Sequence, residues 1–318
     1  KASHTQRKRV PQSMEKLLAL LLAAGCGSAV LALLRRQGRR AKKTRVALVD
    51  NGSLKPEATK SLRRLAAALS ERSKVQVDAV SARFADRIKA KDLDGKKGEV
   101  LEGWLKRISE EDPDAEVRLL PLLIGPSDTL TKAMPEAAKK LSSLEVEIAP
   151  PLVSLCPALF GGQETGAVQL AEMLHSRLRD INLGHGDVVL LCDHGSPVQR
   201  VANAKMAVQA ALASALGREV LHCCMERREG EAYDFNGQLL EATLEGLPEG
   251  STAKVALLFL QEGRHAGPGG DIEQIVEGVM KKRPDLSIQT TAVLAGHTSL
   301  EELLLQRQKQ SIPLRIFH

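Results

Sequence analysis

A short apolar run that ends abruptly in a polar, glycine-bearing loop is the feature that most constrains the fold of this chain. Residues 188–192 are apolar and are followed directly by D-H-G-S at 193–196. This pattern is typical of a buried parallel strand that delivers its last residues to the carboxyl edge of an open α/β sheet, where ligands bind. A related stretch, V-A-L-V-D-N-G-S, spans 46–53 and has Asn51 where the later copy has His194. The sequence therefore predicts two related halves, of which only one retains its imidazole.

The length of the chain and the order of its segments also indicate two α/β units. A chain of 318 residues exceeds what one modest core usually serves. With an aromatic share of only 2%, the cores must be filled by Leu, Val, Ile and Ala. Strand-like runs occur at 45–50, 75–80, 116–124 and 145–152, and again at 188–192, 219–224, 253–260 and 287–294. Amphipathic helical segments lie between them. Each half is thus expected to form a mainly parallel four-stranded sheet flanked by helices.

The amino-terminal 43 residues are predicted to be a targeting or membrane-anchor segment. Residues 17–34 form an apolar run of 18 residues without a charge, which just reaches the length of a membrane-spanning helix. Basic residues flank this run on both sides. The pattern fits a signal anchor, a cleaved signal or the hydrophobic part of an organelle-import presequence, in which case the protein would reside in the plastid stroma. The remaining alternatives are a cytoplasmic or membrane-anchored protein, or a buried helix of the first domain.

The net charge of +6 does not indicate a nucleic-acid-binding protein. Much of the excess lies in the first 43 residues, so that the rest of the chain is close to neutral. Few aromatic side chains are available to stack on single-stranded bases. Nucleic acid is therefore not expected as a partner.

The five cysteines predict neither a disulfide framework nor a structural zinc site. Their number is odd, and no C-x-x-C spacing occurs. Buried, reduced thiols in a reducing compartment such as cytosol or stroma are the expected state.

Three polar side chains follow strands of the second half. His194, Glu226 and His265 each come just after an apolar strand, and the carboxyl ends of parallel strands meet at one edge of a sheet. Two imidazoles and a carboxylate form a ligand set for a borderline divalent metal such as Fe(II), Co(II), Ni(II) or Zn(II). The same groups also suit proton transfer, so the residues alone leave both roles open.

The glycine-rich loop at 263–271 has two interpretations. It is either a flexible connection with Asp271 as the N-cap of the next helix, or a substrate loop in which Arg264 binds carboxylates. Its spacing matches neither a dinucleotide-binding nor a phosphate-binding loop, so no nucleotide cofactor is expected. Serine hydrolysis at Ser196 is also excluded, because no G-x-S-x-G elbow is present.

The two motifs D-H-G-S and L-Q-E-G-R-H-A-G-P-G-G-D resemble those of the sirohydrochlorin chelatases, the class II chelatases that insert iron or cobalt into sirohydrochlorin. In that family one apolar strand ends in H-G-S and a later one in a G-R-H loop, here residues 194–196 and 263–265. Glu226 stands at the place of the family's intervening glutamate. The resemblance covers 185–318 strongly and 44–184 as a degenerate copy, in which Gly125-Pro126-Ser127 stands in place of the second histidine loop.

The resemblance implies two chelatase-like lobes, at 44–184 and 185–318, with the tetrapyrrole held in the cleft between them. It further implies Fe2+ or Co2+ as the metal substrate, His194, Glu226 and His265 as metal ligands and proton acceptors, and no redox or nucleotide cofactor. Tetrapyrrole contacts are expected from Ser196, Gly263 and Arg264, with Arg227 and Arg228 as further partners of the substrate's carboxylates. Asn51, Ser53 and Ser127 are expected to line the cleft without binding metal. The alternative is a tetrapyrrole- or metal-binding protein that kept the fold without catalysis.

Overall fold

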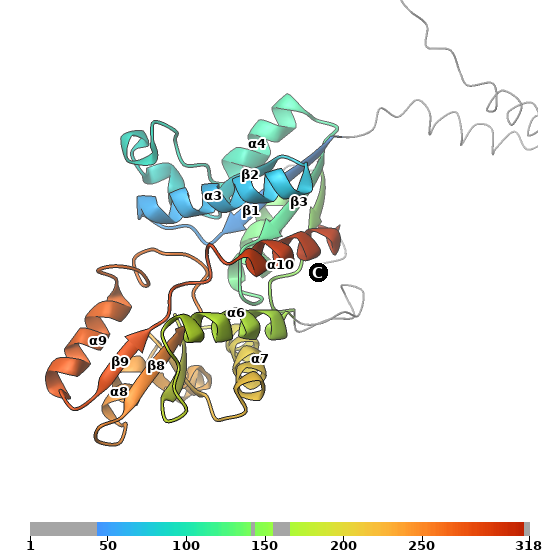
Figure 1. Ribbon diagram of the computed structural model, residues 1–318. Helices are drawn as coiled ribbons and strands as arrows, with labels where there is room; N and C mark the ends of the chain where they lie inside the picture. Colours follow the sequence, from blue (N-terminus) through green and yellow to red (C-terminus); the bar gives the residue numbers. More distant parts are fainter. Residues whose placement is uncertain (1–42, 141–143, 155–165, 315–318) are drawn as a thin grey trace, which may run out of the picture. The chain divides into compact units, whose positions relative to one another are not determined.

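The computed structural model describes residues 43–140, 144–154 and 166–314 (Figure 1). The apolar segment at 17–34 lies outside these residues. Within the part that the structure describes, no helix is long and apolar enough to cross a membrane.

Two five-stranded sheets carry the fold of the described residues. The first has the strand order β10-β4-β3-β1-β2 and the second β7-β6-β5-β8-β9. The strands are β1 Thr44–Asp50, β2 Val77–Ser81, β3 Glu116–Pro121, β4 Glu145–Ile148, β5 Val188–Asp193, β6 Leu221–Cys224, β7 Gln238–Leu239, β8 Thr252–Leu257, β9 Ser287–Thr290 and β10 Ile312–Pro313. All pairs are parallel except β10 with β4. Each sheet therefore contains the four parallel strands expected from the sequence and one further edge strand of two residues, too short to give a periodic pattern.

Helices connect the strands of each sheet, as the alternating pattern predicts. They are α3 Pro56–Ser73, α4 Leu101–Glu111, α5 Met134–Lys139, α6 Ala167–Asp180, α7 Gln199–Leu216, α8 Leu240–Glu245, α9 Asp271–Lys282 and α10 Thr298–Lys309. Several predicted strands end earlier than their apolar runs. In β3, for example, Leu122 still donates one hydrogen bond to Val49 at 2.8 Å, but the chain beyond it packs into the core as irregular backbone.

Alternating residues of the central strands bury opposite faces of each sheet. In β1, Val46 and Leu48 belong to a core shared with the second sheet, whereas Ala47 and Val49 belong to an outer core beneath α4 and α5. In β5, Val189 and Leu191 face the same shared core, and their neighbours face a second outer core with α8 and α9. Both faces are thus dry, as parallel sheets require.

Two helices cover the sheet of the other half of the sequence. Helix α6, from the first half, packs on α7 and β8, and the backbone carbonyl of Ile181 beyond it accepts a hydrogen bond from Lys254 Nζ at 2.8 Å. Helix α10, from the second half, packs on α3 and β3, and β10 then pairs with β4 (Figure 1). The halves therefore exchange helices across one shared core.

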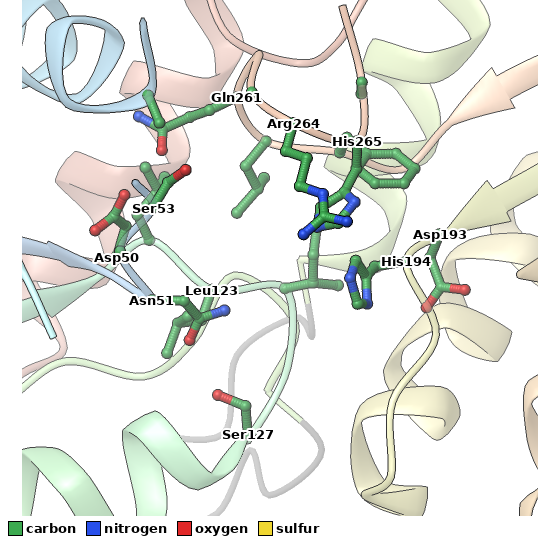
Figure 2. Close-up of a pocket in the computed structure, with 18 of the residues that line it drawn as sticks. Asp50, Asn51, Ser53, Leu123, Ser127, Asp193, His194, Gln261, Arg264 and His265 are labelled. Atoms are coloured by element: carbon green, nitrogen blue, oxygen red, sulfur yellow. The ribbon is translucent and has the colours of Figure 1, made fainter. Parts of the chain in front are cut away.

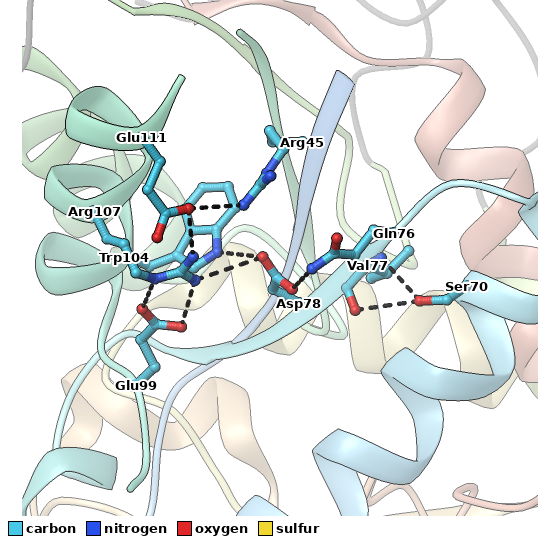
Figure 3. Close-up of polar contacts among 9 residues, drawn as sticks. All are labelled: Arg45, Ser70, Gln76, Val77, Asp78, Glu99, Trp104, Arg107 and Glu111. Atoms are coloured by element: carbon cyan, nitrogen blue, oxygen red, sulfur yellow. Dashed lines mark hydrogen bonds and ion pairs between the residues drawn. The ribbon is translucent and has the colours of Figure 1, made fainter. Parts of the chain in front are cut away.

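Polar contacts attach α4 to the edge of the first sheet (Figure 3). The only tryptophan of the sequence, Trp104, is fully buried, and its indole N–H donates to Asp78 Oδ2 at 2.8 Å. Arg107, one turn later, forms an ion pair with Glu99 at 2.8 Å and with Glu111 at 3.2 Å. A buried indole thus has its hydrogen-bond partner, which fixes α4 against β2.

Truncation of the shared core should destabilise the whole fold. Leu174 in α6 is fully buried in that core. We expect Leu174→Ala to lower the free energy of unfolding by about 2–5 kcal/mol, because the truncation removes contacts and leaves a cavity. Urea unfolding followed by circular dichroism measures this change. Val168, on the same helix, is 45% exposed, and Val168→Ala should change stability by no more than about 0.5 kcal/mol. Equal effects of the two substitutions would contradict the role assigned to α6.

Candidate active site

A large cleft lies at the carboxyl ends of the central strands of both lobes. Its volume is about 1270 Å³, which exceeds the roughly 300–1,000 Å³ typical of pockets for drug-sized ligands. Residues from the loops after β1 and β3 line one side, and residues from the loops after β5 and β8 line the other. Figure 2 shows Asn51, Ser53 and Ser127 on one side of this space and His194 and His265 on the other. The cleft therefore has the position expected from the sequence.

The loop after β5 places His194 beside Glu226. Gly195 has φ 90°, and a Cβ on it would lie 1.9 Å from the carbonyl oxygen of Glu226. Only glycine allows this approach. The backbone N–H of Glu226 donates to the carbonyl of His194 at 3.1 Å, so the loop after β6 is held against the loop after β5.

The side chains of His194 and Glu226 are in contact. His194 Nε2 lies 3.2 Å from Glu226 Oε1, and His194 Nδ1 lies 3.1 Å from the carbonyl oxygen of Gly195. Because that carbonyl can only accept, Nδ1 carries a proton and Nε2 is the atom that faces the carboxylate. Nε2 can therefore bind a metal ion or a proton beside the carboxylate.

His265 contacts both His194 and Asp271. The rings of the two histidines meet edge to face, with centroids 4.5 Å apart and an interplanar angle of 76°. His265 Nδ1 lies 2.7 Å from Asp271 Oδ2. A carboxylate at Nδ1 keeps the proton there and leaves the lone pair on Nε2, an arrangement that serves metal ligands and bases.

Asp271 is the functional side chain that the sequence did not reveal. The N-cap of α9 is Gly270 and no side chain caps the helix, so the interpretation of Asp271 as N-cap is wrong. The intervening loop folds back: the backbone N–H of Asp271 donates to the carbonyl of Arg264, and that of Ile272 to the carbonyl of His265. The pairing of a histidine and a carboxylate six residues apart on a glycine-rich loop is the only signal that could have indicated it.

The three predicted metal ligands are found as contacting pairs. Among the described residues, no group of three or more His, Cys, Asp or Glu side chains is arranged around a single ion position. His194 touches both Glu226 and His265, while Glu226 does not line the cleft itself. His194 is therefore the link between the two other side chains.

The predicted tetrapyrrole contacts fall into two groups. Ser196, Gly263 and Arg264 line the cleft, and the Arg264 side chain is 70% exposed, with Nε 3.6 Å from Asp271. Arg227 and Arg228 do not line it. Arg227 instead forms an ion pair with Asp234, and Arg228 contacts the hydroxyl of Tyr233. The expectation that these two arginines bind substrate carboxylates stays a prediction, and in this structure neighbouring side chains hold both of them outside the cleft lining.

The degenerate lobe lines the cleft with Asn51, Ser53 and Ser127, as expected. The counterpart of His265, however, is Thr129 rather than Ser127. Thr129 lies eight residues after Pro121, the last residue of β3 that pairs with β1. His265 likewise lies eight residues after Leu257, the last residue of β8 that pairs with β5. The Thr129 hydroxyl donates to Asn51 Oδ1 at 2.7 Å. Thr129 and Asn51 therefore contact each other as His265 and His194 do, but with side chains that are poor metal ligands.

An acidic residue ends the first strand of each lobe, but the two differ in their partners. In the second lobe, the fully buried Lys205 forms an ion pair with Asp193 at 2.9 Å. Twelve residues after Asp50, the corresponding position is Leu62. Asp50 is only 8% exposed, and its Oδ1 has no hydrogen-bond partner among the residues that the structure describes. Burial raises the pKa of Asp50 to about 6, against smaller lowering effects of hydrogen bonds from Ser81 and the Gly52 backbone.

Comparison with known proteins identifies relatives of this architecture. Residues 188–311 match the family model described as CbiX. SirB from Bacillus subtilis, in a structure with Fe3+, has a TM-score of 0.60 at 14% identity and covers 84% of this chain and 94% of its own. A CbiX described as the terminal enzyme for biosynthesis of siroheme in denitrifying bacteria has a TM-score of 0.53 at 12% identity, with 84% and 98% covered. No curated protein matches the sequence. These likenesses confirm the predicted fold of two chelatase-like lobes.

The buried carboxyl group of Asp50 should make stability depend on pH. Its ordinary pKa is 3.8, so between about pH 4 and 6 the folded state holds a proton that the unfolded state has lost. The free energy of unfolding should therefore fall by about 3 kcal/mol as the pH rises through this interval. Denaturant unfolding at several pH values should show that Asp50→Asn loses this part of the decline. The exposed Asp128, also on the cleft, provides the control Asp128→Asn, and an unchanged profile in Asp50→Asn would refute the assignment.

Proposed function

We propose that this chain, whose residues 188–311 match the CbiX family model, inserts a divalent metal, Fe2+ or Co2+, into sirohydrochlorin or a related tetrapyrrole. The observation that carries the proposal is the contact of two imidazoles from separate strand ends, on the wall of a cleft of about 1270 Å³. Metal insertion displaces two pyrrole N–H protons, so the site must supply both ligands for the ion and acceptors for the protons. Imidazoles near neutral pH do both.

The separation of His194 and Glu226 suits the delivery of an ion. Two donor atoms 3.2 Å apart would both bind one metal at about 2.1 Å with an angle between them of roughly 100°. Imidazole and carboxylate bind borderline divalent ions. A site with so few protein ligands leaves coordination positions free for pyrrole nitrogens, so the ion can pass to the macrocycle.

His265 is suited to accept a proton. Asp271 holds Nδ1 and stabilises the imidazolium that forms when Nε2 takes up a pyrrole proton. His194 accepts the second proton once its metal has left. Neither step requires a redox or nucleotide cofactor.

The loss of histidine ligands in the first lobe motivates a second candidate, a tetrapyrrole- or metal-binding protein without catalysis. The two candidates share the cleft and the substrate, and they differ in rate. Only the enzyme accelerates metal insertion beyond the rate in solution.

Replacement of either histidine should reduce metal insertion strongly. We expect His194→Ala and His265→Ala to lower the rate by at least about 100-fold, the usual contribution of a positioned acid–base group. Anaerobic incubation of sirohydrochlorin with Fe(II) or Co(II), followed by absorbance, measures the rate. The exposed His185, in the turn before β5, provides the control His185→Ala, which should keep full activity. Binding of the tetrapyrrole by the wild type without faster insertion would instead establish the non-catalytic candidate.

Asp271 should act through His265 as a positioning residue. Asp271→Asn should lower the insertion rate by about 10-fold or more, because loss of a carboxylate behind a histidine typically costs 10–100-fold in activity. The effect should fall on kcat rather than on KM for the tetrapyrrole. In the double variant with His265→Ala, the second substitution should cost almost nothing further. Glu277, exposed on the same helix, gives the control Glu277→Gln, and additive losses in the double variant would show that Asp271 acts independently.

A further inference from the structure

The first lobe contains a counterpart of the candidate site in which the acidic side chain is replaced by a basic one. Strands β1 and β2 pair in the same register as β5 and β6, with the last residue of each first strand opposite the last residue of its neighbour. Asn51 therefore corresponds to His194, and Arg83 corresponds to Glu226. The substitution reverses the charge at this position.

The backbone around the two positions is the same. Gly52 has φ 86°, and a Cβ on it would lie 1.8 Å from the carbonyl oxygen of Arg83. Gly195 has φ 90° and stands in the same relation to the carbonyl of Glu226, at 1.9 Å. Since both loops have this close approach, Arg83 occupies the same backbone position as Glu226 in the other lobe. The two lobes therefore differ here in the side chain and not in the course of the main chain.

Arg83 and Lys55 are cations on the cleft without an acidic partner. Both side chains are exposed, and both line the cleft. Across the described residues, neither forms an ion pair; Arg83 contacts only the ring of Phe84, with its guanidinium 5.8 Å from the centroid. By contrast, Arg264 on the opposite side lies near Asp271. Of the two acidic residues that this lobe places on the cleft, Asp128 is paired with Lys132 at 3.2 Å and Asp50 is only 8% exposed, so Arg83 and Lys55 are its exposed and unpaired charges there.

The surrounding groups on this side can donate hydrogen bonds. Asn51 Oδ1 accepts from Thr129, so its amide N–H groups remain available to a ligand. The hydroxyl of Ser127, which also lines the cleft, is buried and finds no hydrogen-bond partner in the described part of the chain. Cations together with free donors form a site for an anionic group rather than for a metal.

We propose that Arg83 and Lys55 bind a peripheral carboxylate of the tetrapyrrole and thereby fix its orientation against the two histidines. The inference rests on the proposed function for the identity of the ligand. A guanidinium binds a carboxylate with two parallel hydrogen bonds, and the ammonium of Lys55 on the same cleft adds positive charge. On the other side of the cleft, the charged side chain of Arg264 already lies 3.6 Å from the carboxylate of Asp271. The cleft is therefore divided into a side for the cation and the leaving protons and a side for the substrate's anionic edge.

The binding of uroporphyrin, a metal-free porphyrin with eight carboxylates, tests this proposal without any metal insertion. Arg83→Ala should weaken binding about 10-fold, the effect of losing a charge-assisted hydrogen bond, and Lys55→Ala should weaken it less. Arg83→Glu, which restores the acidic residue of the other lobe, should weaken it further. For a porphyrin bearing four N-methylpyridinium groups, the same charge reversal should strengthen binding. Porphyrin fluorescence titration measures all of these affinities.

Arg87 provides the matched control. Its guanidinium lies 5.2 Å from the centroid of the same Phe84 ring, but it does not line the cleft. Arg87→Ala should leave both affinities unchanged. Equal effects of Arg83→Ala and Arg87→Ala, or no effect of either, would overturn the proposal.

Metal insertion separates this proposal from the proposed function. If the enzyme is active, Arg83→Ala should raise KM for the tetrapyrrole with little change in kcat, because the residue contributes binding that the ground state and transition state share. If the enzyme is active but Arg83→Ala leaves its affinity for the porphyrin unchanged, only this inference is refuted. An inactive protein whose porphyrin affinity depends on Arg83 would refute the proposed function and support the carboxylate site.

Discussion

The burial of both faces of each parallel sheet is the constraint on which the rest of this structure depends. Strands such as β1 and β5 place apolar side chains on both faces, so each sheet needs cover on two sides. Local helices cover the outer faces, and the inner faces share one core with α6 and α10. This core holds the two sheets together, and residues at their carboxyl ends line a single cleft. The position of the cleft is thus a consequence of how the strands are buried.

The fold and part of the site could be predicted because they depend on local patterns. Apolar runs ending in glycine loops gave the central strands, and the rule that parallel strands end at one edge brought His194 and His265 together. The contacts of Asp271 could not be predicted in this way, because they require a loop of nine residues to close on itself. The ion pair of Arg227 could not be predicted either, because its partner Asp234 lies in a segment without helical or strand periodicity.

The counterparts in the first lobe show a second limit of sequence patterns. Asn51 was evident as the replacement of a histidine, but Thr129 and Arg83 required the pairing register of the strands. Their neighbouring loops differ in length and composition, so the sequence alone aligned Ser127 with His265. Structural register, once known, also explains why Asp50 forms no ion pair within the described part of the chain: the position of the lysine that neutralises its counterpart is Leu62 in this lobe. Without a cation beside it, burial raises the pKa of this acid to about 6 at the edge of the cleft.

The exchange of α6 and α10 means that neither half of the sequence contains its own complete core. A polypeptide of either half alone would expose the inner face of its sheet and would carry a helix whose apolar side had lost its partner. Two separate copies of one half could bury their inner sheet faces only if each covered the other's sheet with its own helix, as in a domain-swapped dimer. Joining them in one chain makes that mutual cover permanent and independent of concentration. It also frees the two copies to differ, so that one can keep its imidazoles while the other acquires an arginine.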